Sequence, residues 1–281
     1  MTAVMAEATR PGQNEPVFHL SRRDWKAVAV PAEHGGWSFL AEPVTLGLVL
    51  APSAAGACLA FAALAAFLAR HPLRLLLIDR RKGVRYPRTD LAVRVFAGYA
   101  GMAVALFGVA TALAPSPFWA PLLVAAPIGI VALGFDALGR SREALPEAAG
   151  AMALGASATA IALAGNAPTG FAWGAWALLA LRAVTSVLYV RARLRLDRGR
   201  VAGPAAVHVG HAAAFAAATG LAAAGWAPWL APAVFFVLLA RSGWGLSSGR
   251  CPIRPQVLGL QEVGYGLLTL VLLALGYRAG F

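Results

Sequence analysis

The chain has 281 residues, of which 59% are hydrophobic and only 13% are charged, and its mean hydropathy is +0.69. A soluble domain of this size needs more polar surface than this composition supplies, so the sequence indicates an integral membrane protein. The formal net charge of +12 does not indicate nucleic-acid binding, because the arginines flank apolar segments, where they face lipid headgroups.

The first thirty residues contain acidic and basic side chains but no apolar core, so they form neither a signal peptide nor a membrane span. We expect residues 1–30 to form a cytoplasmic, disordered arm, in which Arg22 to Lys26 lie on the membrane surface. Residues 31–281 then make a single integral membrane domain.

Nine apolar stretches follow the arm, and each approaches the length of about 20 residues that a membrane helix needs. They are Gly35 to Leu50, Ser53 to Ala69, Leu91 to Leu113, Phe118 to Phe135, Pro146 to Ala164, Phe171 to Val190, Pro204 to Ala224, Pro228 to Ala240 and Gln256 to Tyr277. This pattern predicts an all-α, polytopic membrane helix bundle of about nine transmembrane helices.

The connections between these stretches alternate between cationic and uncharged. The uncharged ones lie around Pro115, at 166–170 and at 225–227. Because cationic loops stay in the cytoplasm, we expect the amino terminus inside and the short tail with Arg278 outside. The cationic connections carry Arg74, Arg80, Arg81, Lys82, Arg85 and Arg88, then Arg140 and Arg142, then Arg191, Arg193, Arg195, Arg198 and Arg200, then Arg241, Arg250 and Arg254.

The densest polar cluster lies at the start of the first stretch. Glu33 and His34 precede two glycines, and Trp37 follows them at the expected interface. Glu42 lies about seven residues into the stretch, roughly 10 Å at 1.5 Å per residue, a depth at which a carboxylate needs a partner. Free N–H groups at such a helix start favour an anionic ligand beside His34.

Arg182 lies within the sixth stretch, eight residues before its inner end at Val190. An unpaired arginine near a helix centre costs at least about 2.5 kcal/mol, so we expect it to face the bundle interior. Glu42 and Glu262 are the candidate partners, and the sequence does not decide between them. Either the pair ties helices together or it faces a ligand.

Further candidates complete a cytoplasm-facing cavity. We predict that Arg85 and Glu147 line it with Glu33, His34, Glu42, Arg182 and Glu262. Glu147 also has a structural explanation, because a carboxylate in the first turn of a helix is favoured by the helix dipole whatever its function. The cations that suit an anionic headgroup are Arg80, Arg81, Arg191 and Arg193. No metal site is predicted, and the sequence leaves open which residues are catalytic and whether a cofactor binds.

The segment from Pro31 to Pro43 resembles the amino-terminal P-x-E/Q-H-G-x-W signature of the YwiC-like family of bacterial membrane proteins. The stretch from Gly139 to Gly150, and Ser186 to Arg191, lie where later motifs of that family are expected. This resemblance implies a multi-pass protein of the bacterial inner membrane.

The helix count, the orientation and the polar loops after the second and sixth helices are also similar to the UbiA-like intramembrane prenyltransferases. In that superfamily, paired carboxylates in the two loops hold Mg²⁺ against a prenyl diphosphate. This chain has one acid in each loop, Asp79 and Asp197, among many arginines. Such a set does not readily assemble a two-metal site.

These features lead to two hypotheses about function. The first is a protein that binds or modifies an isoprenoid, a quinone-type molecule or another amphiphilic lipid without the usual Asp-rich Mg²⁺ site; whether it turns over a substrate stays open. The second is a small-molecule or proton-coupled transporter that uses the charges inside the membrane. The absence of charge from the outer halves of the stretches favours the first.

Overall fold

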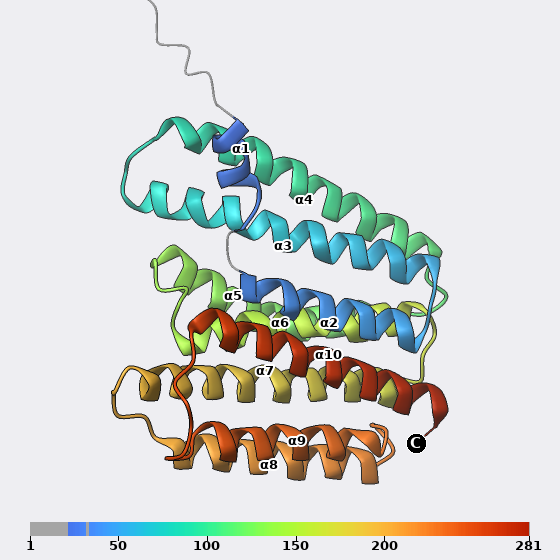
Figure 1. Cartoon of the computed structure of the whole chain (residues 1–281). Helices are drawn as coiled ribbons and strands as arrows, with labels where there is room; N and C mark the ends of the chain where they lie inside the picture. The colour runs from blue at the N-terminus through green and yellow to red at the C-terminus, as the bar shows by residue number, and fades with distance from the viewer. Residues whose placement is uncertain (1–21, 32–33, 281) are drawn as a thin grey trace, which may run out of the picture.

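The computed structural model describes residues 22–31 and 34–280, and the described residues form ten helices and no strand. Figure 1 shows most of them lying side by side along one direction. In chain order they are α1 (Arg22–Ala29), α2 (His34–Leu50), α3 (Ala54–Arg81), α4 (Pro87–Leu113), α5 (Ala120–Ala137), α6 (Ala144–Ala164), α7 (Thr169–Asp197), α8 (Pro204–Ala223), α9 (Leu230–Gly245) and α10 (Pro255–Ala279).

Each of the nine apolar stretches coincides with one helix, from α2 to α10. Seven of these helices are long and apolar enough to cross a membrane, whereas α9 and the apolar part of α2, Gly36–Leu50, are shorter. The all-helical membrane bundle is therefore confirmed, and the count of nine spans stays a prediction.

Two helices continue well beyond their predicted ends. The second stretch was expected to end at Ala69, but α3 runs to Arg81, and α7 passes Val190 to reach Asp197. Arginine and leucine are both strong helix formers, so segments such as RLLLIDRR stay helical after they leave the apolar region. Much of the cationic sequence that was expected in loops is thus helical.

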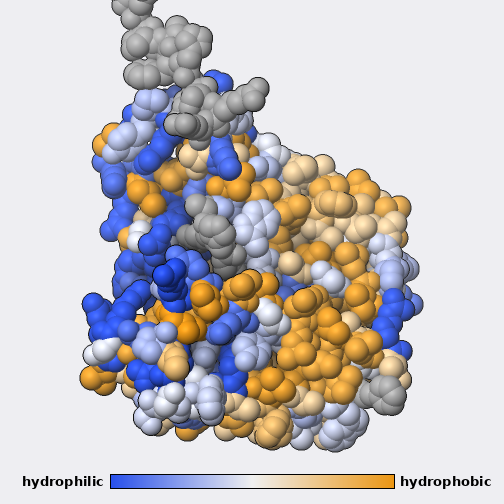
Figure 2. Space-filling model, viewed as in Figure 1, coloured by the Kyte–Doolittle hydropathy of each residue, from blue (hydrophilic) through white to orange (hydrophobic). Residues whose placement is uncertain are grey.

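Charged and apolar surfaces are separated along the bundle. Figure 2 shows hydrophilic residues gathered at the end that carries α1 and the α3–α4 connection, whereas hydrophobic residues cover much of the rest of this face. Large side chains such as Val104 and Leu123 are exposed on α4 and α5. Exposed apolar flanks of this kind are what a lipid environment requires.

The centre of the bundle is built from small residues. α6 is alanine-rich, and Ala156, Ala158 and Ala162 on it are fully buried. On α2, a Cβ added to Gly47 would lie 2.7 Å from the carbonyl oxygen of Ala158, so this glycine lets the two backbones approach closely. Small residues at such contacts allow the van der Waals packing that holds membrane helices together.

Helix α1 lies against the protruding ends of α3 and α4 (Figure 1). Val28 is buried against Leu91 and Ala92 of α4. The ring of His71 contacts the carbonyl oxygen of Ala27 at 3.0 Å. The last part of the predicted arm is therefore a docked helix, while residues 1–21 lie outside the described residues.

Candidate functional site

A buried ion pair joins α2 to α7. Nη2 of Arg182 lies 3.3 Å from Oε1 of Glu42, and both side chains are almost fully buried. The same Nη2 donates to the backbone carbonyl of Glu262 at 3.2 Å. Of the two candidate partners, Glu42 thus supplies the carboxylate and Glu262 supplies only its main-chain oxygen.

A second buried ion pair continues the cluster into α9 and α10. Nη1 of Arg241 donates to Oε1 of Glu262 at 2.6 Å, and the Arg241 guanidinium lies 4.2 Å from the ring centre of Tyr189 and 4.9 Å from that of Tyr265. Contacts with two aromatic rings add cation–π stabilisation to the ion pair. Arg241 of α9 is therefore held by side chains of α7 and α10.

A histidine on α8 contacts the same arginine. Nδ1 of His211 lies 2.9 Å from the carbonyl oxygen of Val207, so this nitrogen is the one that carries the hydrogen. Nε2 is then free to accept from Nη2 of Arg241 at 3.4 Å. Together, the two ion pairs and His211 connect five helices through buried polar contacts.

Two glycines make room for these side chains. A Cβ at Gly266 would lie 2.2 Å from Oε1 of Glu42, and one at Gly245 would lie 2.1 Å from the hydroxyl oxygen of Tyr189. Side chains larger than hydrogen would displace the Glu42 carboxylate or the tyrosine ring. The cluster therefore depends on the exact residue at both positions.

A polar pocket of about 790 Å³ lies beside the cluster, toward the charged end of the bundle. Its arginines are Arg193, Arg241 and Arg250, and its other walls come from α7, α9, α10 and the connection between α9 and α10. Val237, Trp244 and Leu268 also line it and are exposed on the flank of the bundle. The polar pocket thus has a cationic lining on one side and opens toward the apolar flank of the bundle on the other.

Asp197 holds the floor of the polar pocket in place. Its carboxylate accepts from Nε of Arg193 at 2.9 Å and lies 3.4 Å from Nε of Arg250. Arg193 also donates to the backbone carbonyls of Gly245 and Cys251. The α9–α10 connection is therefore fixed to the end of α7 by charge-assisted hydrogen bonds.

Several buried polar atoms of this region have no hydrogen-bond partner among the described residues. They are Nε of Arg182, Oγ of Ser186, Nε of Arg241 and Oε2 of Glu262. A buried polar atom without a partner costs about 1–3 kcal/mol, so such atoms are rare unless water or a ligand satisfies them. Their concentration in one cluster marks it as a candidate binding site.

The remaining predicted residues do not join this cluster. Arg85 pairs with Asp90 near the α3–α4 connection, and Glu147 lies 3.3 Å from Arg191 at the exposed start of α6. Arg80 and Arg85 line a separate pocket of about 430 Å³ between α3 and α4. Arg81 ends α3 and is exposed. The predicted set is therefore distributed over three places at the charged end.

The first motif is only partly described. Glu33 lies outside the described residues, and His34 begins α2 without a described side chain. Trp37 packs edge-on against Phe67 of α3 at 5.2 Å between ring centres. The roles predicted for Glu33 and His34 stay predictions.

Arg241 is the functional candidate that the sequence did not reveal. It was assigned to a loop because the apolar stretch ends at Ala240, but α9 continues to Gly245. The buried positions Val234, Leu238, Arg241 and Gly245 recur at helical spacing and mark the inner face of α9. This spacing is the signal that would have placed Arg241 inside the bundle.

A buried pair on the other side of the bundle was also not predicted. Nε and Nη2 of Arg70 on α3 donate to both oxygens of Asp136 on α5, at 2.8 and 3.1 Å. Asp136 is fully buried. No three His, Cys, Asp or Glu side chains come together as a metal-ligand set in the part of the chain that the structure describes.

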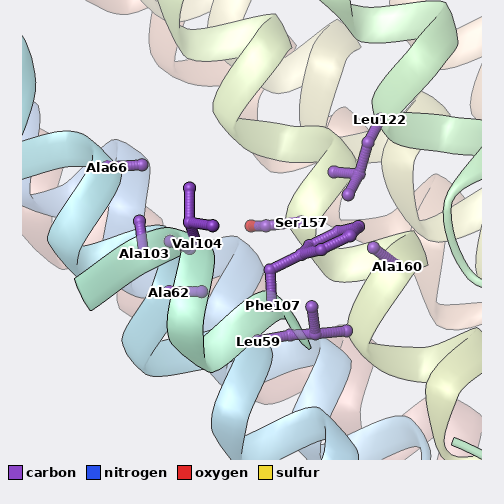
Figure 3. Close-up of a pocket in the computed structure, with 10 residues that line it drawn as sticks. Leu59, Ala62, Ala66, Ala103, Val104, Phe107, Leu122, Ser157 and Ala160 are labelled. Carbon is purple, nitrogen blue, oxygen red and sulfur yellow. The ribbon is translucent and has the colours of Figure 1, made fainter. Parts of the chain in front are cut away.

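Apolar cavities open on the flank beside that pair. One of about 330 Å³ lies between α3, α4, α5 and α6 and contains a single polar side chain, Ser157, among its lining residues. Figure 3 shows Phe107 and Leu122 approaching this cavity from α4 and α5, with Leu59 and Ala62 of α3 on another side. Its chemistry is that of a hydrocarbon site.

An all-helical bundle with apolar flanks, one charged end and charges paired in its interior defines a multi-pass integral membrane protein. Residues 30–162 match the family model described as YwiC-like protein, so this part of the chain is similar to the YwiC-like family. The match includes Glu42 and ends within α6, before the helices that carry Arg182, Arg241 and Glu262. No curated protein and no solved structure matches the chain.

Proposed function

We propose that the protein binds an amphiphilic lipid, of isoprenoid or quinone type, with its polar head in the pocket lined by Arg193, Arg241 and Arg250. The pocket joins a cationic floor to the exposed apolar residues Val237, Trp244 and Leu268. An amphiphile has the same two-part character, so its head and its chain both find complementary surfaces. The chain enters from the surrounding lipid without crossing water.

The observation that carries this proposal is the free Nε–H of Arg241. Two sides of the guanidinium are used by Glu262 and His211, and Nε has no partner in the described part of the chain. A phosphate, carboxylate or quinone oxygen in the pocket accepts a hydrogen bond from it, which removes the cost of the unpaired donor.

The charge balance favours an anionic or electron-rich head. Four guanidinium groups, of Arg182, Arg193, Arg241 and Arg250, face three carboxylates, of Glu42, Asp197 and Glu262. One positive charge is thus in excess in this part of the bundle. A single negative charge on the ligand would neutralise it, which matters more inside a low-dielectric membrane than in water.

The orientation with the charged end in the cytoplasm belongs to the same proposal, because cationic segments stay on that side. A UbiA-like arrangement of the helices is also proposed, with chemistry that does not use two Mg²⁺ ions. The oxygens of Asp79 already accept from Arg88 and Thr89, and those of Asp197 are shared by Arg193 and Arg250.

Native mass spectrometry of the protein purified in a mild detergent tests the proposal. We expect a co-purified polyprenyl lipid or quinone on the wild-type protein, and a smaller number of bound molecules on Arg241→Lys. Lysine keeps a positive charge for Glu262 but has no Nε–H in that position, so binding falls by about tenfold while the protein stays folded.

Arg254→Gln is the matched control, since Arg254 is exposed at the start of α10 and does not line the pocket. It should retain the bound lipid. A wild-type protein that carries only bulk phospholipid, or an unchanged adduct on Arg241→Lys, would contradict the proposal.

The second candidate, a proton-coupled transporter, is supported by the buried carboxylates themselves. Oε2 of Glu262 has no partner among the described residues, and Glu42 is buried beside Arg182. A transporter would move protons through these groups, so proteoliposomes should then show a substrate-driven pH change that Glu262→Gln abolishes. Absence of that change together with a bound lipid favours the first function.

A further inference from the structure

Two cavities on the flank opposite the polar pocket join into one groove. The first, of about 330 Å³, and the second, of about 430 Å³, share Ala66, Ala103 and Val104 in their linings. We call the combined space the long groove. Its floor and walls come from α3, α4, α5 and α6, and Figure 3 shows its outer part.

The long groove extends farther than one lipid leaflet. Along α3 its lining runs from Leu59 to Leu73, a distance of about 21 Å at 1.5 Å per residue. The hydrocarbon core of a bilayer is about 30 Å thick, so each leaflet contributes about 15 Å. A chain that fills the groove therefore passes the bilayer midplane.

The lining favours a hydrocarbon chain over a protein helix. Of the ten residues around the outer part, nine are Ala, Val, Leu or Phe. The tenth is Ser157, whose hydroxyl donates a hydrogen bond to the carbonyl oxygen of Leu154 at 2.7 Å. A space of this volume is narrower than a helix, whose diameter with side chains is about 10–12 Å. A single flexible chain fits it.

At the charged end of the long groove, the guanidinium group of Arg70 contributes to the lining. Asp136 occupies Nε and Nη2 of Arg70, and Nη1 makes no hydrogen bond within the described part of the chain. Nη1 lies 3.9 Å from the place where a Cβ of Gly150 would be, and both residues line the groove. One edge of the guanidinium is thus fixed while the other faces the groove.

We propose that the long groove is a second lipid site, which binds a polyprenyl phosphate with its chain across the midplane and its phosphate against Nη1 of Arg70. Arginine recognises phosphate oxygens through such free donor edges. A phospholipid carries two acyl chains, whereas a groove of this volume has room for one. The groove therefore selects a phosphate with a single chain.

This site does not rest on the proposed function, because the polar pocket is built from α7, α9, α10 and the α9–α10 connection. The test uses delipidated full-length protein in detergent, titrated with geranylgeranyl phosphate and followed by native mass spectrometry. Phosphatidic acid is the comparison ligand, since it offers a phosphate on two chains of similar length. We expect geranylgeranyl phosphate to bind about tenfold more tightly or better.

Ala103→Phe places a ring in the shared middle of the groove, and we expect it to weaken binding of geranylgeranyl phosphate by about tenfold or more. Ala105→Phe adds the same ring at the same depth on an exposed face of α4 that does not line the groove, and should leave binding unchanged.

Arg70→Lys tests the head contact. A lysine keeps the charge beside Asp136 but has only one nitrogen, so it cannot serve the carboxylate and the ligand in the same way. We expect weaker binding of geranylgeranyl phosphate and an unchanged affinity for geranylgeraniol, which lacks the phosphate. Arg241→Lys should have no effect at this site.

Equal affinities for phosphatidic acid and geranylgeranyl phosphate would overturn the choice of ligand. Equal binding by Ala103→Phe and Ala105→Phe would show that the chain does not lie in the groove. Loss of binding in Arg241→Lys with Arg70→Lys unaffected would assign the ligand to the polar pocket instead.

Discussion

Glu42 and Arg182 face each other between α2 and α7, with 3.3 Å between Oε1 and Nη2. Both are buried, and Gly266 on α10 lies so close that an added Cβ would be 2.2 Å from the carboxylate. The pair therefore sits at a junction of three helices. A charge left alone at this junction would be costly, which makes the pair a sensitive point for testing the fold.

Removing one partner of the pair should destabilise the protein more than removing both. We expect Arg182→Gln to cost about 3–5 kcal/mol because it leaves the Glu42 carboxylate buried without a countercharge. The double variant Glu42→Gln/Arg182→Gln should regain part of that loss. Thermal unfolding in detergent gives the apparent Tm of each variant, and a purely additive double-mutant cycle would contradict direct pairing.

Gly266→Ala should disturb the same ion pair by steric contact alone. The new methyl group meets Glu42 Oε1 and Arg182 Nη2, so we expect a destabilisation of about 1–3 kcal/mol from overpacking. Gly264→Ala is the control, since nothing lies within 4 Å of its Cβ position and alanine is the better helix former. Equal Tm values for the two variants would show that α10 is not packed against the pair.

The native cysteines report the proposed orientation. Cys251 is exposed in the α9–α10 connection at the charged end, whereas Cys58 is partly buried near the outer start of α3. A membrane-impermeant maleimide should label Cys251 only in inverted vesicles and leave Cys58 unlabelled in both preparations. Labelling of Cys251 from the outside of intact cells, after outer barriers are removed, would reverse the orientation.

Mg²⁺-dependent prenyl transfer should be absent. The carboxylates of Asp79 and Asp197, at the ends of α3 and α7, are engaged by Arg88, Thr89, Arg193 and Arg250, so they offer no pair of free oxygens to two metal ions. With a prenyl diphosphate, Mg²⁺ and an aromatic acceptor, we expect no release of diphosphate above background. Turnover that Asp79→Ala or Asp197→Ala abolishes would show that these carboxylates do assemble a metal site.

Hydropathy was enough to place the helices but not their ends. The nine stretches match α2 to α10 because lipid demands long apolar segments with satisfied backbones. The ends of α3 and α7 were missed, since helix formation by arginine and leucine continues outside the apolar region. Arg241 was missed because α9 also continues past its apolar stretch, to Gly245.

The sequence predicted how deep the site residues lie in the membrane, but not which helices lie next to one another. Glu42, Arg182 and Glu262 were grouped because they lie at similar depths from one face, and the structure brings them together. Arg85 and Glu147 also lie at the charged end, but Arg85 is in the α3–α4 connection and Glu147 is at the start of α6, on other parts of the bundle. Depth can be counted along one helix, whereas the neighbours of a helix depend on packing that the sequence does not display.

The two short apolar helices, α2 and α9, each carry one member of a buried ion pair, and this has a consequence for biogenesis. During synthesis α2 leaves the ribosome long before α7, so Glu42 must enter the membrane before Arg182 exists to pair with it. Arg241 likewise precedes Glu262. Both helices are poor candidates for stable insertion by themselves, because their length is marginal and their charge is unpaired. We therefore expect α2 and α9 to reach their final positions in the membrane only after α7 and α10 have been synthesised.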